Sequence, residues 1–265
     1  MVSTAAFERL TPNEEKRLSM YIHEEVCTNC AKCIPTCPVR AIYVDRSRKH
    51  VTIDQELCVE CGVCYRSGVC EHAGLVRPTL TWPRSIRAAL SDPLIVNPET
   101  RIPGRGTEEM KTNEVTGRYR RGYLGIAVEL GRPGVGASFV DIQKVACACA
   151  RHGVHFCPQN PITTLMIDTS TGDINPEVLG ERVLSGIVEF EAPLEDAPAI
   201  LDTLREVSKE LDTVFSLDVI SLVEPDGSFP IFPLLEKAGL SPSPNGKNNM
   251  GLGRPAFDFF GDSAS

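Results

Sequence analysis

The chain has 265 residues and a formal net charge of −8. It is long enough for one large or two modest domains, and its acidity argues against nucleic acid as a main partner. Hydrophobic residues make up 42% of the chain but aromatic residues only 6%, whereas 21 Gly and 20 Pro are present. This balance favours small modules that are joined by irregular segments.

No apolar run approaches the length of a membrane span, and the acidic N-terminal stretch lacks the apolar core of a secretory signal. Eleven cysteines without an export signal predict a reducing compartment. We therefore expect a cytoplasmic protein with no membrane span.

Residues 1–21 are predicted to form an N-terminal arm with a short helix. Thr11 is a good N-cap, Pro12 suits the first helical position, and Glu14 completes a capping box. So short a helix is not stable alone. We favour an arm that packs over the next module, with a free docking arm as the alternative.

Eight cysteines fall in two closely spaced runs. The runs read Cys27-x2-Cys30-x2-Cys33-x3-Cys37-Pro38 and Cys58-x2-Cys61-x2-Cys64-x5-Cys70. Three thiolates spaced in this way can hold three corners of one iron–sulfur cube. Zinc sites usually pair two short Cys-x2-Cys hooks instead of triples, and disulfides fit small secreted domains, so both are weaker alternatives.

The two runs resemble the dicluster [4Fe–4S] ferredoxin domain of bacterial ferredoxins, over roughly residues 22–80. The resemblance implies two [4Fe–4S] clusters, with the fourth Cys of each run reaching the other cluster. It assigns cluster I to Cys27, Cys30, Cys33 and Cys70, and cluster II to Cys58, Cys61, Cys64 and Cys37.

The second run departs from this pattern just before Cys70. Five residues precede that Cys instead of three, and Glu71 stands where Pro is usual. The insertion Arg66-Ser67-Gly68 places a positive charge beside a cluster. A guanidinium that stays close would raise the cluster potential.

An internal repeat supports the module, because Val26-Cys27 aligns with Leu57-Cys58 at an offset of 31 residues. Between the two halves, residues 42–44 and 51–53 alternate around the polar turn Asp45–His50 and predict a hairpin. The resemblance implies a pseudo-twofold βαββαβ module.

Residues 81–121 are predicted to be an extended strap. They contain Trp82 and a possible short helix over Ser85–Leu90, but Gly104–Arg118 has no core-forming pattern. A long irregular segment in a compact protein is functional or disordered. We favour an ordered strap that docks on a partner or between domains, and a flexible linker is the alternative.

Residues 122–225 return to regular patterns, which predict a βαββαβ ferredoxin-like sandwich. The expected strands are Tyr123–Leu130, Thr163–Asp168, Val183–Phe190 and Val214–Val223. Ser138 caps the first helix, whose apolar face is Phe139, Ile142, Val145, Ala146 and Cys149. The second helix is Glu195–Leu211, with Ile200, Leu204, Val207 and Leu211 on one stripe. The fold class is therefore α+β, with two modules and long irregular straps.

Three weaker signals remain in this half. The turn Gly131–Gly136 before a helix could bind an anion, but tight-turn geometry explains its glycines. Cys147, Cys149 and Cys157 are interpreted as structural core residues, with a ligand or redox role as the alternative. Residues 226–265 are a Pro/Gly-rich tail that is either solvated or a docking hook, with Phe257, Phe259 and Phe260 near its end.

The predicted function is electron transfer. We expect a relay subunit of a multi-subunit, anaerobic oxidoreductase, with protein partners that include a catalytic subunit and an electron donor or acceptor. Whether the chain is itself an enzyme stays open. The alternatives are a single-chain reductase that binds substrate between its domains, and a redox-sensing regulatory or assembly protein.

Fragments outside the cysteine module are similar to iron–sulfur proteins associated with 6-hydroxynicotinate reductase and related anaerobic ring-reducing systems. They are Gly104–Arg118, Gly125–Glu129 with Gly131–Gly134, and Gly251–Pro255. This resemblance implies a place in a larger reductase complex.

Overall fold

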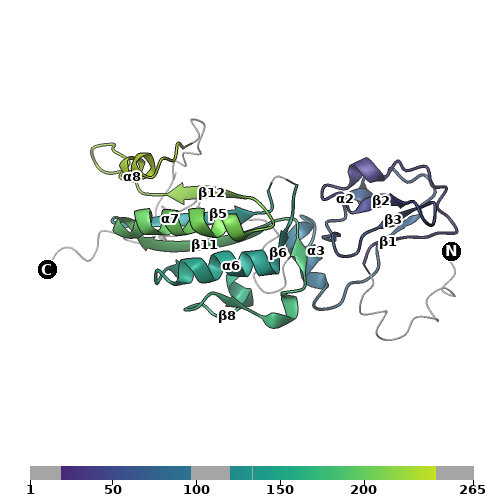
Figure 1. Ribbon diagram of the computed structural model, residues 1–265, viewed down its shortest axis with the longest axis horizontal. Helices are drawn as coiled ribbons and strands as arrows, with labels where there is room; N and C mark the ends of the chain where they lie inside the picture. The colour runs from purple at the N-terminus through teal and green to yellow at the C-terminus, as the bar shows by residue number, and fades with distance from the viewer. Residues whose placement is uncertain (1–18, 97–119, 133, 243–265) are drawn as a thin grey trace. The chain divides into compact units, whose positions relative to one another are not determined.

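The computed structural model describes residues 19–96, 120–132 and 134–242 (Figure 1). The predicted N-terminal helix, the strap Gly104–Arg118 and the three phenylalanines of the tail lie outside the described residues. The described chain forms two compact units. The described residues of unit 1 fall within Met1–Gly104, Gly131–Val140 and Pro176–Gly186. The described residues of unit 2 fall within Arg105–Leu130, Asp141–Asn175 and Ile187–Ser265.

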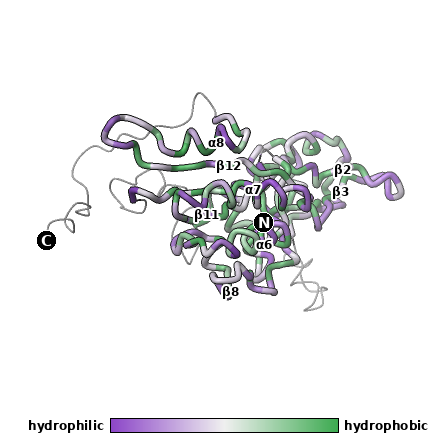
Figure 2. Tube along the Cα trace, turned by 60° about the vertical axis from the view of Figure 1, so that its left-hand side comes forward, coloured by the Kyte–Doolittle hydropathy of each residue, from purple (hydrophilic) through white to green (hydrophobic). Residues whose placement is uncertain are grey.

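Two antiparallel ladders frame the N-terminal part of unit 1. Strand β1 (Tyr21–Ile22) pairs with β4 (Leu75–Val76), and β2 (Ile42–Asp45) pairs with β3 (His50–Ile53). The second ladder confirms the predicted hairpin. Asp45 Oδ1 closes its turn by accepting the Ser47 N–H at 2.8 Å, and Figure 2 shows this turn as hydrophilic.

The core of this part is small, and the cysteines complete it. Its buried members are Met20, Ala41, Ile42, Val51, Ile53, Cys64 and Leu75. Ten partly buried side chains pack against them, and five of these are the cysteines Cys27, Cys33, Cys37, Cys58 and Cys70. The helical turns η2 (Ile34–Thr36) and α2 (Val63–Arg66) occupy similar places in the two halves. A module with so little hydrocarbon relies on its cysteine site for cohesion.

Helix α3 (Ser85–Ser91) belongs to unit 1 and buries six of its seven residues. Arg87 in this helix forms an ion pair with Glu181, and Ser91 Oγ accepts the Leu184 N–H at 2.8 Å. Strand β6 (Ala137–Ser138) pairs with β10 (Arg182–Val183) in the same unit.

The units therefore differ from the predicted domains. Residues 81–96 of the predicted strap, and two segments of the predicted sandwich, are built into unit 1. The physical reason is that the buried Arg87 of α3 pairs with Glu181 of the predicted sandwich and donates to the Cys58 carbonyl of the cysteine module. No pattern of hydrophobic residues reveals these contacts. Trp82 of the predicted strap donates its indole N–H to Glu177 Oε2 at 2.7 Å and is 45% exposed.

Unit 2 is built around one four-stranded sheet with the strand order β12-β5-β11-β7. The strands are β5 (Tyr123–Leu130), β7 (His155–Phe156), β11 (Gly186–Pro193) and β12 (Phe215–Ile220). β12 pairs antiparallel with β5, and β7 pairs antiparallel with β11. Helices α6 (Phe139–Ala150) and α7 (Ala197–Val207) run alongside the strands (Figure 1).

The predicted second strand, Thr163–Asp168, is wrong. Asn160 Oδ1 accepts the Ile162 N–H at 2.8 Å and starts a helical turn, η3 (Thr163–Leu165). The rest forms β8 (Met166–Asp168), which pairs with β9 (Asp173–Ile174) in a separate ladder. The second sheet strand along the chain is instead β7, which is too short to give a periodic signal.

Two other predicted elements are divided in the structure. The strand Val183–Phe190 breaks after β10, where the Leu184 N–H bonds to Ser91, and resumes as β11. The helix Glu195–Leu211 consists of α7 between two helical turns, η5 (Leu194–Asp196) and η6 (Ser208–Glu210). Its stripe is buried except for Leu211. The predicted apolar face of α6 is confirmed, since all five of its side chains are fully buried.

Short elements complete the fold. They are η4 (Pro176–Val178) and α8 (Phe232–Lys237). The second lies in the segment that the sequence predicted to be an irregular tail, where Phe229 and Phe232 stack with ring centroids 4.9 Å apart. Within the described ranges, no helix combines the length and apolarity that a membrane crossing requires.

Candidate iron–sulfur centre

The two cysteine loops share one backbone conformation. Asn29 and Glu60, each two residues after the first Cys of a run, have φ of 57° and 56°. Ala31 and Gly62, two residues further on, have φ of 60° and 67°. Positive φ is uncommon outside glycine and costs roughly 1 kcal/mol or more per residue. The sequence repeat is therefore also a repeat of backbone conformation, with positive φ at equivalent positions of the two loops.

The same correspondence holds after the last Cys of each run. The Ala41 N–H donates to Cys37 Sγ at 3.1 Å, and the Gly74 N–H donates to Cys70 Sγ at 3.1 Å. The two-residue insertion before Cys70 is absorbed upstream, because Cys70 reaches the geometry that Cys37 has. N–H donors at sulfur stabilise a thiolate over a thiol.

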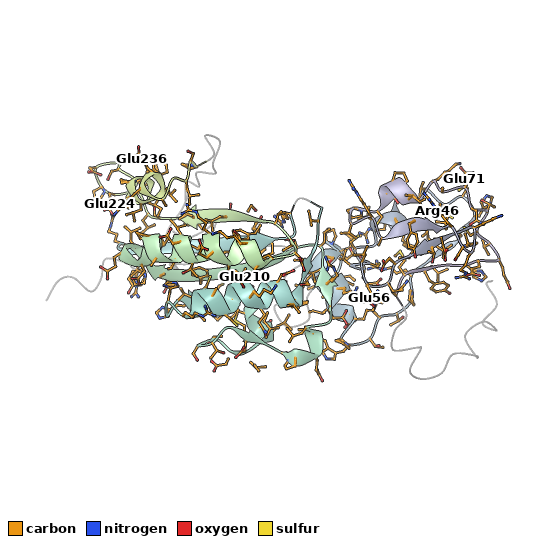
Figure 3. The ribbon with its side chains drawn as sticks, in the orientation of Figure 1. Arg46, Glu56, Glu71, Glu210, Glu224 and Glu236 are labelled. Atoms are coloured by element: carbon orange, nitrogen blue, oxygen red, sulfur yellow. The ribbon has the colours of Figure 1, made fainter. Side chains whose placement is uncertain are left out.

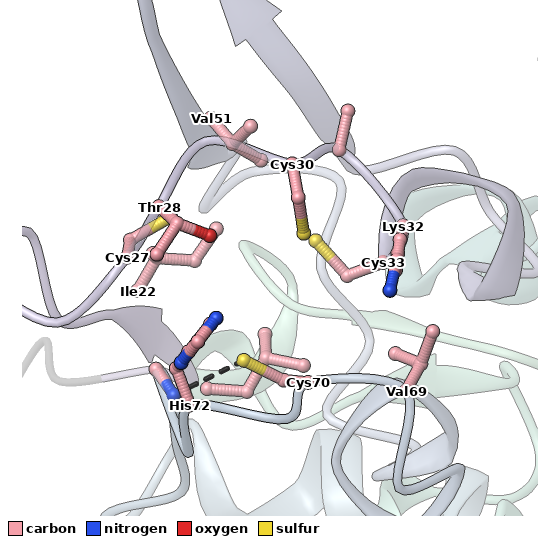
Figure 4. A pocket seen from close by; sticks show the side chains of 13 residues that line it. Ile22, Cys27, Thr28, Cys30, Lys32, Cys33, Val51, Val69, Cys70 and His72 are labelled. Carbon is pink, nitrogen blue, oxygen red and sulfur yellow. Dashed lines mark hydrogen bonds between the residues drawn. The ribbon is translucent and has the colours of Figure 1, made fainter.

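One pocket of unit 1 brings together the four cysteines that were assigned to cluster I (Figure 4). Cys27, Cys30 and Cys33 come from one loop, and Cys70 comes from the opposite side. The other lining residues are Ile22, Thr28, Ala31, Lys32, Val51, Val69, His72, Gly74 and Leu75. Most of these are apolar or small, so the thiols face a space that is lined mainly by apolar side chains.

The other four cysteines also affect one another. Burial, followed by the nearby thiols of Cys61, Cys58 and Cys37, raises the pKa of Cys64 to about 12. Burial likewise raises the pKa of the Cys58 and Cys61 thiols. The thiols of the second predicted group are thus close enough to affect one another, and two of them, Cys61 and Cys64, are buried. A bound metal would favour their thiolate forms.

The two groups differ in exposure. Cys30 of the first group is exposed, whereas Cys61 and Cys64 of the second are buried. An ion pair on the surface, Lys32 Nζ to Glu71 Oε1 at 2.7 Å, joins the two runs beside the first group. Glu71 is labelled in Figure 3, and its side chain is 69% exposed.

Sequence reasoning missed the buried charges around the second group. Glu60, inside the Cys58–Cys61 hook, has no exposed side-chain surface and pairs with Arg84 Nε at 3.1 Å. The Arg87 guanidinium donates to the Cys58 carbonyl at 2.7 Å. An acidic residue within a metal-binding hook, followed by two arginines in a short helix, is the signal that could have found them.

The remaining predictions for single residues are resolved more simply. Cys149 and Cys157 are buried, with 0% and 4% exposure, and Cys147 Sγ lies 3.7 Å from Asp173 Oδ1. In the turn that begins at Gly131, the N–H groups of Val135 and Gly136 both donate to the Gly131 carbonyl at 3.0 Å. These two N–H groups are therefore engaged within the turn and do not point to a bound anion. In the part of the chain that the structure describes, no three His, Cys, Asp or Glu side chains lie close enough together to bind a single metal ion. The cysteines of the two runs are spaced more widely, around a pocket in the case of the first group.

The eight cysteines of the two runs fit iron–sulfur clusters in donor chemistry. Soft thiolates are the ligands that such clusters select, and these lie in two groups of four with backbone donors at sulfur. The first group also encloses a pocket lined mainly by apolar residues.

Comparison with known proteins agrees with this assignment of the N-terminal part. Residues 19–71 match the family model described as the 4Fe-4S dicluster domain. The match includes all eight cysteines of the two runs, so this part of the chain is a 4Fe–4S ferredoxin-type domain. The search of curated proteins found no match. The search of solved structures found none either.

Proposed function

We propose that this protein transfers electrons through two [4Fe–4S] clusters and serves as the relay subunit of a larger cytoplasmic oxidoreductase. The observation that carries the proposal is the repeated geometry of the two cysteine loops, with matched positive φ values and matched N–H donors at Cys37 and Cys70. The family description, dicluster, supports the number of clusters.

In this proposal the ligands are divided between the runs. Cys27, Cys30, Cys33 and Cys70 hold cluster I, and Cys58, Cys61, Cys64 and Cys37 hold cluster II. Each cluster, when bound, accepts or gives one electron at a time. The protein fixes the thiolates, donates N–H groups to sulfur and keeps water out with aliphatic side chains.

The exposed position of Cys30 makes cluster I the natural place for exchange with a partner protein. Electron transfer needs close approach, and two thiols of the second group, those of Cys61 and Cys64, are buried. The donor, the acceptor and the catalytic subunit are protein partners in this scheme. An anaerobic setting is part of the same proposal, because exposed clusters are damaged by oxygen.

The sheet of unit 2 supports a finer proposal about its fold. Its main elements run β5-α6-β7-β11-α7-β12, and the strand order is β12-β5-β11-β7. We infer a βαββαβ ferredoxin-like sandwich, which would serve as a docking body for partners. The similarity to ring-reducing systems rests on sequence fragments alone and leaves the substrate of the complex open.

The test is iron and sulfide analysis of the anaerobically purified chain. Eight iron and eight sulfide per chain are expected, since each of two cubane clusters holds about four of each. A value near four removes one cluster, and zinc in place of iron overturns the proposal. Anaerobic co-purification from native cells then identifies which proteins bind the chain.

A further inference from the structure

We propose that Arg66, Arg77 and Asp92 form a charged triad around a buried carboxylate, and that this triad positions the loop Cys61–Cys64 and raises the reduction potential of the cluster that this loop helps to hold. All three are positioning residues, since they act through the loop. The inference rests on the proposed two-cluster function and deepens it.

The triad is centred on one carboxylate. Asp92 Oδ2 accepts from Arg66 Nη1 at 2.7 Å and from Arg77 Nη2 at 2.5 Å. Asp92 Oδ1 accepts the Leu94 N–H at 3.0 Å. The Asp92 side chain has 0% exposure, and those of Arg66 and Arg77 have 29% and 21%. The carboxylate is therefore shielded from solvent, and the two guanidinium groups that contact it are partly exposed.

The triad is attached directly to the cysteine loop. Arg66 Nη2 donates to the Cys61 carbonyl at 2.8 Å. A Cβ atom built on Gly62, the next residue, would clash with Arg66 Nη1 and would lie 3.0 Å from Arg77 Nη1 and 3.1 Å from Asp92 Oδ2. The charged atoms are thus packed against the backbone between Cys61 and Cys64, and a glycine is required for them to come so close.

The charges of the triad do not cancel. Burial alone would raise the pKa of Asp92, but hydrogen bonds from the Leu94 N–H, Arg66 and Arg77 outweigh it and lower that pKa, so the carboxylate is ionised. Two guanidinium groups and one carboxylate leave a net charge of about +1. The other buried arginines nearby, Arg84 and Arg87, each have one carboxylate partner.

The redox consequence follows from charge. Reduction adds one electron, which a low-potential reductant such as dithionite supplies, and it forms and breaks no bond to the protein. The cluster site becomes more negative by one charge. A nearby net positive charge stabilises that product more than the oxidised site, so it raises the potential.

The experiment is an anaerobic redox titration of the full-length, cluster-loaded chain, followed by electron paramagnetic resonance. Arg77→Gln removes a positive charge and is expected to lower the midpoint of one cluster, while the other stays in place. Asp92→Asn removes a negative charge in nearly the same volume and is expected to raise the same midpoint. Arg77→Lys keeps the charge and is expected to restore the native value.

Arg48→Gln is the matched control. It makes the same charge change at an exposed pair with Glu24, whose side chains are 57% and 56% exposed, and is expected to shift neither midpoint. If both clusters are present and Arg77→Gln and Asp92→Asn leave both midpoints unchanged, or shift them in one direction, the inference is wrong. Loss of one cluster from Arg77→Gln that Arg77→Lys restores supports the positioning role, and loss that Arg77→Lys does not restore contradicts it. A native chain without two clusters contradicts the proposed function instead, before any variant is compared.

Discussion

The backbone N–H of Gly74 donates to Cys70 Sγ at 3.1 Å. Ala41 makes the same bond to Cys37 in the other half of the repeat. The irregular Cys is therefore held in the same way as the regular one, and both are expected to be ligands. Cys70→Ser should disturb the cluster of Cys27, Cys30 and Cys33, and Cys37→Ser the cluster of the second run.

Iron analysis together with electron paramagnetic resonance of the reduced protein distinguishes the two variants. Each should lose or alter one signal, and the two altered signals should differ. Cys157→Ala is the control, since that Cys lies outside both groups and should leave about eight iron per chain. Two variants that alter the same signal would rule out crossed ligation.

Gly62 gives a second prediction, because the equivalent residue of the other loop is Ala31. Both have positive φ, but only Gly62 has charged atoms where a Cβ would lie. Gly62→Ala should displace Arg66 and lower the free energy of unfolding by more than the roughly 1 kcal/mol of backbone strain. Ala31→Gly should be neutral or slightly stabilising, since it removes such strain.

Denaturant unfolding of the loaded chains under argon measures both variants. The bleaching rate of the clusters in chelator gives a second readout, and it should rise for Gly62→Ala alone. Equal stability of the Gly62→Ala variant and the native chain would mean that the loop adapts without cost.

The cysteine loops could be recognised in the sequence because their spacing is a local pattern, and the family match over residues 19–71 supports that interpretation. The hairpin at Asp45 was also predictable, since alternation and a polar turn are local signals. The buried face of α6 was predicted for the same reason, from one helical period.

The parts that could not be predicted depend on distant partners. Arg87 has partners at Cys58 and Glu181, and nothing local marks an arginine as buried. The strand β7 has two residues, too few for a period. Thr163–Asp168 has a strand-like composition, but the Asn160 side chain starts a helical turn there.

The pair Glu60–Arg84 gives a third prediction about stability. Glu60 has 0% and Arg84 10% side-chain exposure. Removing Arg84 leaves the buried carboxylate with only uncharged donors, the Ser19 hydroxyl and the Met20 N–H. Arg84→Met should lower the free energy of unfolding by about 3–5 kcal/mol. Adding Glu60→Gln to it should recover part of the loss.

Denaturant unfolding of the loaded chain measures this effect, with Arg48→Met as its matched control. Arg48 pairs with Glu24 at the surface, so its loss should cost about 0–1 kcal/mol. A cost for Arg84→Met as small as that of Arg48→Met would show that the buried pair contributes little.

Cys147 and Cys149 give the last prediction, because they lie two residues apart on α6 and differ in environment. Cys149 is 0% exposed, and burial raises the pKa of its thiol from 9.0 to about 12. Cys147 is partly exposed. Burial, followed by the nearby Asp173 carboxylate, also raises the pKa of its thiol. Alkylation needs the thiolate and access to it. Cys147 should therefore be modified in the native chain at mildly alkaline pH, whereas Cys149 should react only after unfolding.

The sign of the pH effect follows from the raised pKa of Cys149. Its neutral thiol favours the folded state fully below pH 9, and this contribution is lost as the pH rises from 9 through about 12. Cys149→Ala should therefore lose less stability over that interval than Cys147→Ala does. Mass spectrometry of alkylated peptides, native against denatured, gives the labelling order. Native labelling of Cys149 at a rate equal to that of Cys147 would mean that α6 opens readily, and the core assigned to it would be wrong.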